Sequence, residues 1–136
     1  MKRSILACLA GLLTWMVVVT VINRVLRLSL PYYIAAEKTL QFTLVMKWAR
    51  LMMAIVTSVV AGAVTGWISR PSRWAPLIVG SVVFAMFLPG HIAIWSKFPV
   101  WYHLTFLLPI IPAVLLGALL SQRRNKDLNE VYSAPR

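Results

Sequence analysis

Two histidines, His91 and His103, are the side chains in this sequence best suited to chemistry in apolar surroundings. They stand on either side of a short turn at residues 96–99, which separates two apolar segments. On helices that rise about 1.5 Å per residue, both imidazoles would lie roughly 8 to 10 Å from that turn. Two imidazoles at one depth suit a bound metal or haem, a proton shuttle, or a hydrogen bond to a quinone.

Prolines near both histidines predict bent helices with unpaired carbonyl groups. Pro89 precedes His91, and Pro109 and Pro112 follow His103. Proline lacks an N–H and clashes with the carbonyl four residues earlier, so it interrupts the hydrogen bonds of a helix. Because a freed carbonyl in lipid needs a partner, we hypothesise a small polar pocket in this region. Its candidate members are His91, His103, Thr105 and Glu37.

A simpler hypothesis competes with this pocket. The bends would then serve packing alone, and each histidine would bond only to a neighbouring carbonyl or a lipid headgroup. Under either hypothesis the sequence predicts no resident cofactor. Haem or metal binding by His91 and His103 is the weaker alternative, because it requires both side chains to face one cavity.

The four apolar segments contain no aspartate or glutamate. The acidic residues stand outside them, at Glu37, Asp127 and Glu130. Small multidrug antiporters depend on a carboxylate buried in the membrane, and general acid–base catalysis needs paired titratable groups. The sequence therefore argues against a proton-coupled transporter of that kind and predicts that the chain is not an enzyme.

A face of small side chains recurs every four residues in the second apolar segment, at Ala54, Ser58, Gly62 and Gly66. Such faces let the backbones of neighbouring helices approach closely in lipid. Either this chain's own helices or another subunit would pack against it. Ala7 with Gly11 and Ala113 with Gly117 offer matching faces on two other segments, which favours packing within the chain.

The composition places the chain in a bilayer. Of its 136 residues, 60% are hydrophobic and 12% charged, whereas soluble domains carry about 25% charged residues. A helix needs about 20 apolar residues to cross the hydrocarbon core. We therefore predict an all-α integral membrane protein with four transmembrane helices in an antiparallel bundle. The predicted spans are about 5–22, 51–68, 74–95 and 100–120, in a single domain of residues 1–122 followed by a short polar cytoplasmic tail, 123–136.

The segment 28–50 is predicted to lie at the membrane surface, between the first and second spans. A proline and two tyrosines at residues 31–33 mark a turn at headgroup depth, and the charged side chains of residues 37–50 make burial in lipid costly. The end of this segment suits an amphipathic helix that runs into the second span. Leu40, Phe42 and Leu44 alternate as in a strand, which is the competing interpretation.

Basic residues set the predicted orientation. The chain has 14 Lys and Arg against 3 Asp and Glu, and they flank apolar segments, where they anchor helices to anionic headgroups. We therefore expect the lipid bilayer as a partner and no nucleic acid. One side would carry eight of them, which are Lys2, Arg3, Arg70, Arg73, Arg123, Arg124, Lys126 and Arg136. The other side would carry the remaining six, so both termini are predicted to be cytoplasmic.

The segments Phe98–Leu104 and Glu37–Thr43 resemble stretches of small bacterial inner-membrane proteins. That resemblance implies a location in the inner membrane and no particular activity. We predict a non-enzymatic accessory or structural subunit that packs through small-residue helix faces, in a homo-oligomer or a larger membrane complex. The alternatives are a small homo-oligomeric transporter or channel for a small solute, and a haem-, metal- or quinone-binding subunit that uses His91 and His103.

Overall fold

The computed structural model describes residues 2–69 and 72–133, with side chains described as far as Arg124. The described residues form helices and no strands: α1 (Lys2–Ser29), α2 (Tyr33–Thr39), α3 (Leu44–Ser69), α4 (Trp74–Ala93), the 3-10 helix η1 (Trp95–Lys97), α5 (Val100–Leu107) and α6 (Ile110–Ser133). The predicted all-helical class is therefore confirmed. Within this part of the chain, α1, α3, α4 and the stretch Val100–Arg124 are each long and apolar enough to cross a membrane. Arg70, Arg136 and the side chain of Lys126 lie outside the described residues.

The first helix is longer than the predicted span. Arg24 and Arg27 continue α1 rather than end it, because arginine is a good helix former and both lie in the last turns of the helix. The helix ends at Ser29, shortly before Pro31. Proline disfavours helical geometry in the residue before it, which accounts for the position of the break.

The segment 28–50 is divided among the end of α1, the short helix α2 and the start of α3. α3 begins at Leu44, so it takes in residues that the sequence placed before the second span. The Thr43 hydroxyl accepts a hydrogen bond from the backbone N–H of Met46 at 3.3 Å. A threonine before the first turn stabilises a helix start in this way, whereas the alternation of residues 40–44 produces no strand.

The fourth apolar segment is interrupted where the sequence predicted a bend. α5 ends at Leu107 and α6 begins at Ile110, with Pro109 between them. Pro109 cannot donate a hydrogen bond and its ring conflicts with the preceding turn, so the helix cannot continue through it unbroken. Pro112 lies in the first turn of α6, where a missing N–H is tolerated.

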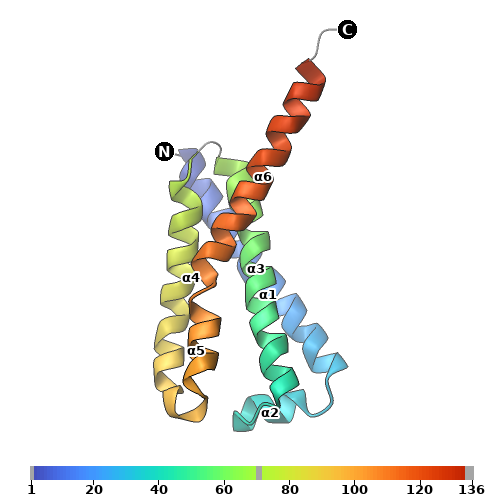
Figure 1. The fold of residues 1–136 in the computed structure, drawn as a ribbon, viewed down its shortest axis with the longest axis vertical. Coiled ribbons are helices and arrows are strands. Elements are labelled where there is room, and N and C mark those ends of the chain that lie inside the picture. Colours follow the sequence, from blue (N-terminus) through green and yellow to red (C-terminus); the bar gives the residue numbers. More distant parts are fainter. Residues whose placement is uncertain (1, 70–71, 134–136) are drawn as a thin grey trace.

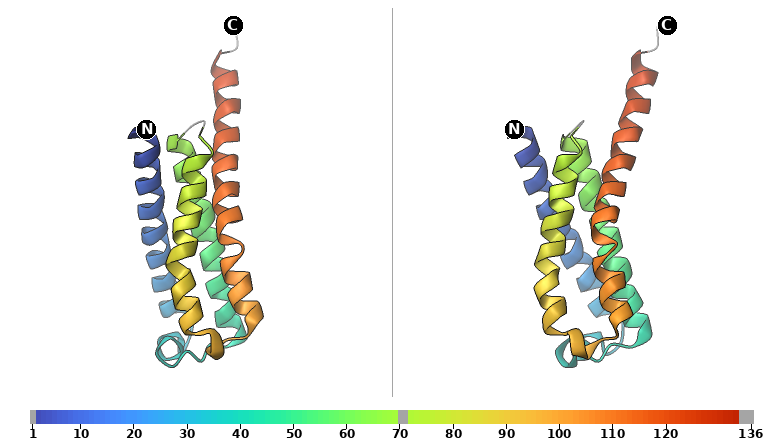
Figure 2. Two further views of the ribbon diagram at one scale, coloured as in Figure 1. Left: turned by 90° about the vertical axis from the view of Figure 1, so that its left-hand side faces the viewer. Right: turned by 60° about the vertical axis from the view of Figure 1, so that its left-hand side comes forward.

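α3 is the central helix of the molecule. It packs most extensively against α6 and α1, and α4 contacts all three of these helices. Figure 2 shows α1 and α6 on opposite sides of α3. Both termini lie toward one end of the molecule, whereas α2 and the connection between α4 and α5 lie at the other (Figure 1). α6 extends beyond the other helices (Figure 1).

The small residues on α3 lie inside the molecule. Ala54 and Ser58 are buried, and a Cβ added to Gly62 would overlap the Val114 carbonyl of α6. A Cβ on Gly66 would come within 2.6 Å of the Ala118 backbone. On the other side of α3, Gly11 of α1 lies against Thr65. The face is therefore occupied by this chain's own helices, whose backbones approach closely because these side chains are small.

Replacing Gly62 by alanine should destabilise the fold, because the added methyl group would force α3 and α6 apart. Overpacking of this kind typically costs about 1–3 kcal/mol. Gly90→Ala is the matched control, since a Cβ at Gly90 would meet nothing within 4 Å. We expect the Gly62 variant alone to lower the midpoint of unfolding in detergent. Equal midpoints for the two variants would contradict the close contact.

Candidate functional site

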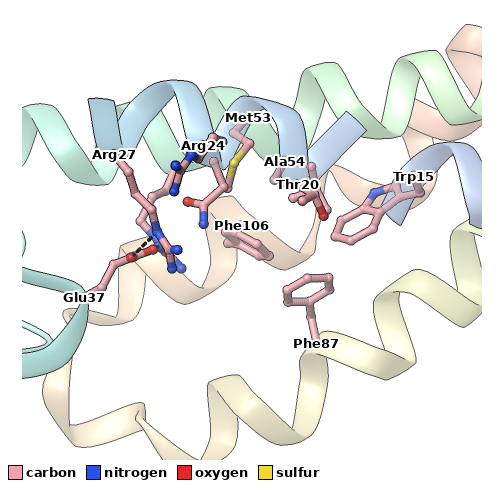
Figure 3. Close-up of a pocket in the computed structure, with 12 residues that line it drawn as sticks. Trp15, Thr20, Arg24, Arg27, Glu37, Met53, Ala54, Phe87 and Phe106 are labelled. Carbon is pink, nitrogen blue, oxygen red and sulfur yellow. Dashed lines mark hydrogen bonds and ion pairs between the residues drawn. The ribbon is translucent and has the colours of Figure 1, made fainter. Parts of the chain in front are cut away.

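A cavity of about 450 Å³ opens toward the α2 end of the molecule, among α1, α2, α3, α4 and α5. We call it the arginine cavity. One end is lined by Asn23, Arg24, Arg27, Glu37 and Arg50, and the other by Trp15, Val19, Met53, Phe87 and Phe106. Figure 3 shows the charged side chains gathered on one side and the rings of Trp15 and Phe87 on the other. The cavity is therefore charged at one end and apolar at the other.

Three segments bring the charged groups together. Arg24 and Arg27 are three residues apart, so they share a face of α1, whereas Arg50 comes from the second turn of α3. α2 carries Glu37 between them. Arg27 Nε donates to Glu37 Oε2 at 2.7 Å, and Arg50 Nη1 lies 3.6 Å from Glu37 Oε1. Three arginines against one glutamate leave the lining with two net positive charges.

Arg50 has an unused donor. Its guanidinium lies over the Phe42 ring at 4.8 Å, and Nη1 donates to the Tyr33 hydroxyl at 3.2 Å. Its Nε is buried and bonds to no described residue. An unpaired buried donor costs about 1–3 kcal/mol, and more when it is charged. The side chain is therefore suited to an acceptor that the described part of the chain does not supply.

Aromatic rings form the apolar end of the cavity. The Trp15 indole is fixed by its N–H, which donates to Ser58 Oγ at 3.3 Å. The ring centroids of Trp15 and Phe87 are 5.1 Å apart, and those of Phe87 and Phe106 are 5.3 Å apart. These separations are typical of packed aromatic pairs. The result is an apolar wall that suits a hydrocarbon chain.

The two histidines form a pair. His91 lies on α4 and His103 on α5, and their Nδ1 atoms are 2.9 Å apart. His103 Nε2 lies 3.3 Å from the Trp95 carbonyl, and the two rings stack with centroids 4.5 Å apart. Both histidines are buried. The connection between α4 and α5 thus holds the pair together through Trp95.

A second cavity, of about 360 Å³, adjoins this pair. We call it the histidine cavity. It is lined mostly by apolar and aromatic side chains, with Arg50, His91 and Tyr102 as the polar ones. Arg50, Phe87 and Phe106 also line the arginine cavity. The two cavities are therefore neighbours with one shared wall.

The histidine pair is not arranged as the two axial ligands of a haem. An iron held in line between the rings, about 2.0–2.1 Å from each nitrogen, would keep the two nitrogens roughly 4 Å apart. The observed 2.9 Å is instead the distance of a hydrogen bond. No cluster of three or more His, Cys, Asp or Glu side chains suited to a metal occurs among the described residues.

The remaining candidates of the predicted polar pocket lie elsewhere. Thr105 bonds within its own helix, where its hydroxyl donates to the Trp101 carbonyl at 2.6 Å, and it lines neither cavity. Glu37 lies with the arginines rather than with the histidines. The structure therefore joins His91 to His103 and separates both from Thr105 and Glu37.

Sequence reasoning missed the arginine cavity, because its basic residues were interpreted as anchors to lipid headgroups. The spacing of Arg24 and Arg27 on one helix face was an available signal. The position of Arg50 opposite them depends on how α1 and α3 pack, which the sequence pattern does not show. Glu37 offered a second signal, as the acidic residue nearest to them in the sequence.

The fold and the two cavities are compatible with a multi-pass helical membrane protein. No protein-family model, curated protein or solved structure matches the chain. The chemistry of the two cavities is therefore the basis for a functional proposal.

Replacing Glu37 by glutamine should loosen α2, because the charge-assisted hydrogen bond from Arg27 is weakened. The Arg27 side chain is 42% exposed, so we expect a loss of only about 1 kcal/mol, or roughly a fivefold rise in local opening. Hydrogen exchange of the α2 amides measures this opening. Lys38→Gln is the control, since it removes an exposed charge from the same helix. Equal exchange in both variants would contradict a role for the ion pair.

Proposed function

We propose that this chain is a non-enzymatic membrane protein that binds an anionic amphiphile in the arginine cavity. The anionic group would lie among the arginines and the hydrocarbon chain against the aromatic rings. The observation that carries the proposal is the division of the cavity into an end with two net positive charges and an apolar end. A ligand with a phosphate at one end and an apolar tail at the other complements both ends.

The arginines favour a phosphate or carboxylate over a neutral polar group. The planar guanidinium binds such groups with paired hydrogen bonds, and charge-assisted bonds of this kind are about twice as strong as neutral ones. Glu37 accepts a hydrogen bond from only one nitrogen of the Arg27 guanidinium, and it also lies near Arg50. Arg50 lines the cavity as well and adds its positive charge to that of Arg24 and Arg27.

The apolar end favours a lipid over a free anion. The rings of Trp15, Phe87 and Phe106 would make van der Waals contact with a hydrocarbon tail that enters from the bilayer. Free phosphate would gain nothing from this end of the cavity. A phospholipid or another lipid with an anionic headgroup is therefore the ligand class we propose.

The proposed setting is a bilayer, in which the four long helices form an antiparallel bundle in the inner membrane with both termini in the cytoplasm. Outward-facing apolar side chains support this setting: Leu13 is 64% exposed, and Leu116 is 51% exposed. In water these surfaces would favour aggregation, whereas in lipid they face their natural solvent. The arginine cavity would then lie near the outer surface, within reach of lipid headgroups.

The accessory or structural role predicted from the sequence stays a proposal, as does assembly into a homo-oligomer or a larger complex. The faces of α3 that include Gly62 and Gly66 lie against helices of this chain. A partner would therefore dock elsewhere on the molecule. Lipid binding is compatible with an accessory subunit and with a small transporter or channel.

Native mass spectrometry in mild detergent tests the binding proposal. We expect retained phosphatidylglycerol at one molecule per chain, with weaker retention of phosphatidylcholine. Arg27→Gln and Arg50→Gln should each weaken retention of the anionic lipid by roughly tenfold, since each removes a charged donor. Lys97→Gln is the matched control, because it removes one charge from an exposed position outside both cavities.

Two results would overturn this proposal. Equal retention of both lipids, unchanged in the arginine variants, would mean that the protein carries only unspecific surface lipid. Binding of inorganic phosphate as tightly as phosphatidylglycerol would mean that the apolar end contributes nothing.

Labelling of single cysteines in intact cells tests the proposed orientation. In a Cys8→Ala background, a membrane-impermeant maleimide should modify Lys97→Cys and leave Arg124→Cys unmodified until the membrane is opened. The opposite labelling pattern would mean that both termini face outward rather than toward the cytoplasm. Modification of both sites in intact cells would rule out the four-span topology.

A further inference from the structure

We propose that the histidine cavity is a second binding site, for an uncharged, hydroxylated aromatic ring whose hydroxyl donates a hydrogen bond to Nε2 of His91. The proposal goes beyond anion binding in the arginine cavity, because it concerns a different cavity and a ligand of different chemistry. It rests on the hydrogen bonds of the histidine pair and on the rings that line the cavity.

Hydrogen bonding fixes the proton positions of the neutral pair. A carbonyl only accepts, so His103 Nε2, 3.3 Å from the Trp95 carbonyl, is the nitrogen that carries hydrogen. The lone pair of a neutral His103 is then on Nδ1. His91 Nδ1, 2.9 Å away, must therefore donate to it.

This arrangement leaves an acceptor on His91. A neutral imidazole that is protonated at Nδ1 keeps a lone pair on Nε2. Among the described residues, the hydrogen bond of His91 uses Nδ1 and leaves Nε2 without a partner. The buried atoms without a partner in this part of the chain do not include Nε2, so this nitrogen is accessible. Since His91 lines the histidine cavity, its lone pair is available to a donor bound there.

The lining of the cavity favours a flat ring. The His91 and Phe106 rings lie 4.6 Å apart, and those of Phe98 and Tyr102 lie 4.9 Å apart and stack. An aromatic ligand would extend this set of ring contacts. The volume of about 360 Å³ lies in the range of small-molecule sites and suits one or two fused rings.

The lone pair on His91 Nε2 favours a ligand that carries a hydrogen-bond donor over one that carries only acceptors. An anion or a carbonyl at Nε2 would face a lone pair, whereas a phenolic hydroxyl would complete a hydrogen bond. A second oxygen on the ring would find a donor in Arg50, which lines the same cavity. Aromatic diols of the hydroquinone type, carried on an apolar tail, therefore belong to the proposed ligand class.

Nitrogen-15 NMR of histidine-labelled protein in nanodiscs tests the proton positions directly. We expect hydrogen on Nδ1 of His91 and on Nε2 of His103 in the wild-type protein. On addition of 2-naphthol, the signal of His91 Nε2 should shift as it accepts a hydrogen bond. Hydrogen on Nε2 of His91 in the unliganded protein, or an unchanged signal at saturating 2-naphthol, would overturn the proposal.

Equilibrium binding to the same nanodiscs tests the ligand class, with protein-free nanodiscs subtracted. We expect 2-naphthol to bind roughly tenfold more tightly than 2-methoxynaphthalene, which has the same rings and no donor. His91→Phe should abolish this preference while retaining the binding of the methyl ether. Ile92→Phe is the matched control, because it adds the same ring at an exposed neighbouring position and should keep the preference.

A preference that survives in His91→Phe would mean that another residue recognises the hydroxyl. An equal affinity of the wild-type protein for both compounds would also overturn the proposal. If His91→Phe does not fold, His103→Phe provides a second variant. It removes the acceptor that fixes the His91 tautomer, so the preference for 2-naphthol should narrow and the Nδ1 signal of His91 should change. An unchanged preference in that variant would contradict the tautomer argument.

Discussion

Close backbone contact between α3 and α6 is the interaction on which the other contacts depend. Lipid provides no hydrophobic drive between apolar helices, so their association relies on van der Waals contact at short distance. Gly62 and Gly66 on α3 and Gly117 on α6 allow that distance, since a Cβ at any of them would overlap the opposite helix. The contact makes α3 the centre of the molecule, and α1 packs on its other side through Gly11.

Side-chain size explains why the cavities lie toward the α2 end. The glycine contacts occur in the half of α3 beyond Ser58, where neighbouring backbones meet. Toward the start of α3 the facing side chains are large, and the arginine cavity is lined there by Arg50, Met53 and Phe106. Large side chains hold helices apart at one end while glycines join them at the other. The arginine cavity and the histidine cavity therefore lie at the end where the facing side chains are large.

Arg50 connects the two proposed sites. It lines both cavities and approaches Glu37 on one side and the ring of Phe42 on the other. The arginine cavity supplies an excess of positive charge, whereas the histidine cavity supplies a lone pair among aromatic rings. The two sites thus suit ligands of different charge, both with apolar parts that a bilayer would deliver.

The sequence by itself determined the long helices of the fold, whereas it left the structure of residues 28–50 undecided. The lengths of the apolar segments predicted four long helices, and Pro109 predicted the break between α5 and α6, because hydropathy and proline act locally. The short turn between the two histidines placed them at one depth on neighbouring segments, and their Nδ1 atoms lie 2.9 Å apart.

Only the tertiary structure decided which side chains meet. Arg24, Arg27, Glu37 and Arg50 come from three helices. Local spacing places Arg24 and Arg27 on one helix face, but it does not show that Arg50 lies opposite them or that all four residues line one cavity. In a soluble protein the apolar face of a helix identifies its inner side. In lipid the outer side is apolar as well, so hydropathy predicts the helices but not the rotation of each one about its axis. That rotation is set by the fit of small and large side chains between helices.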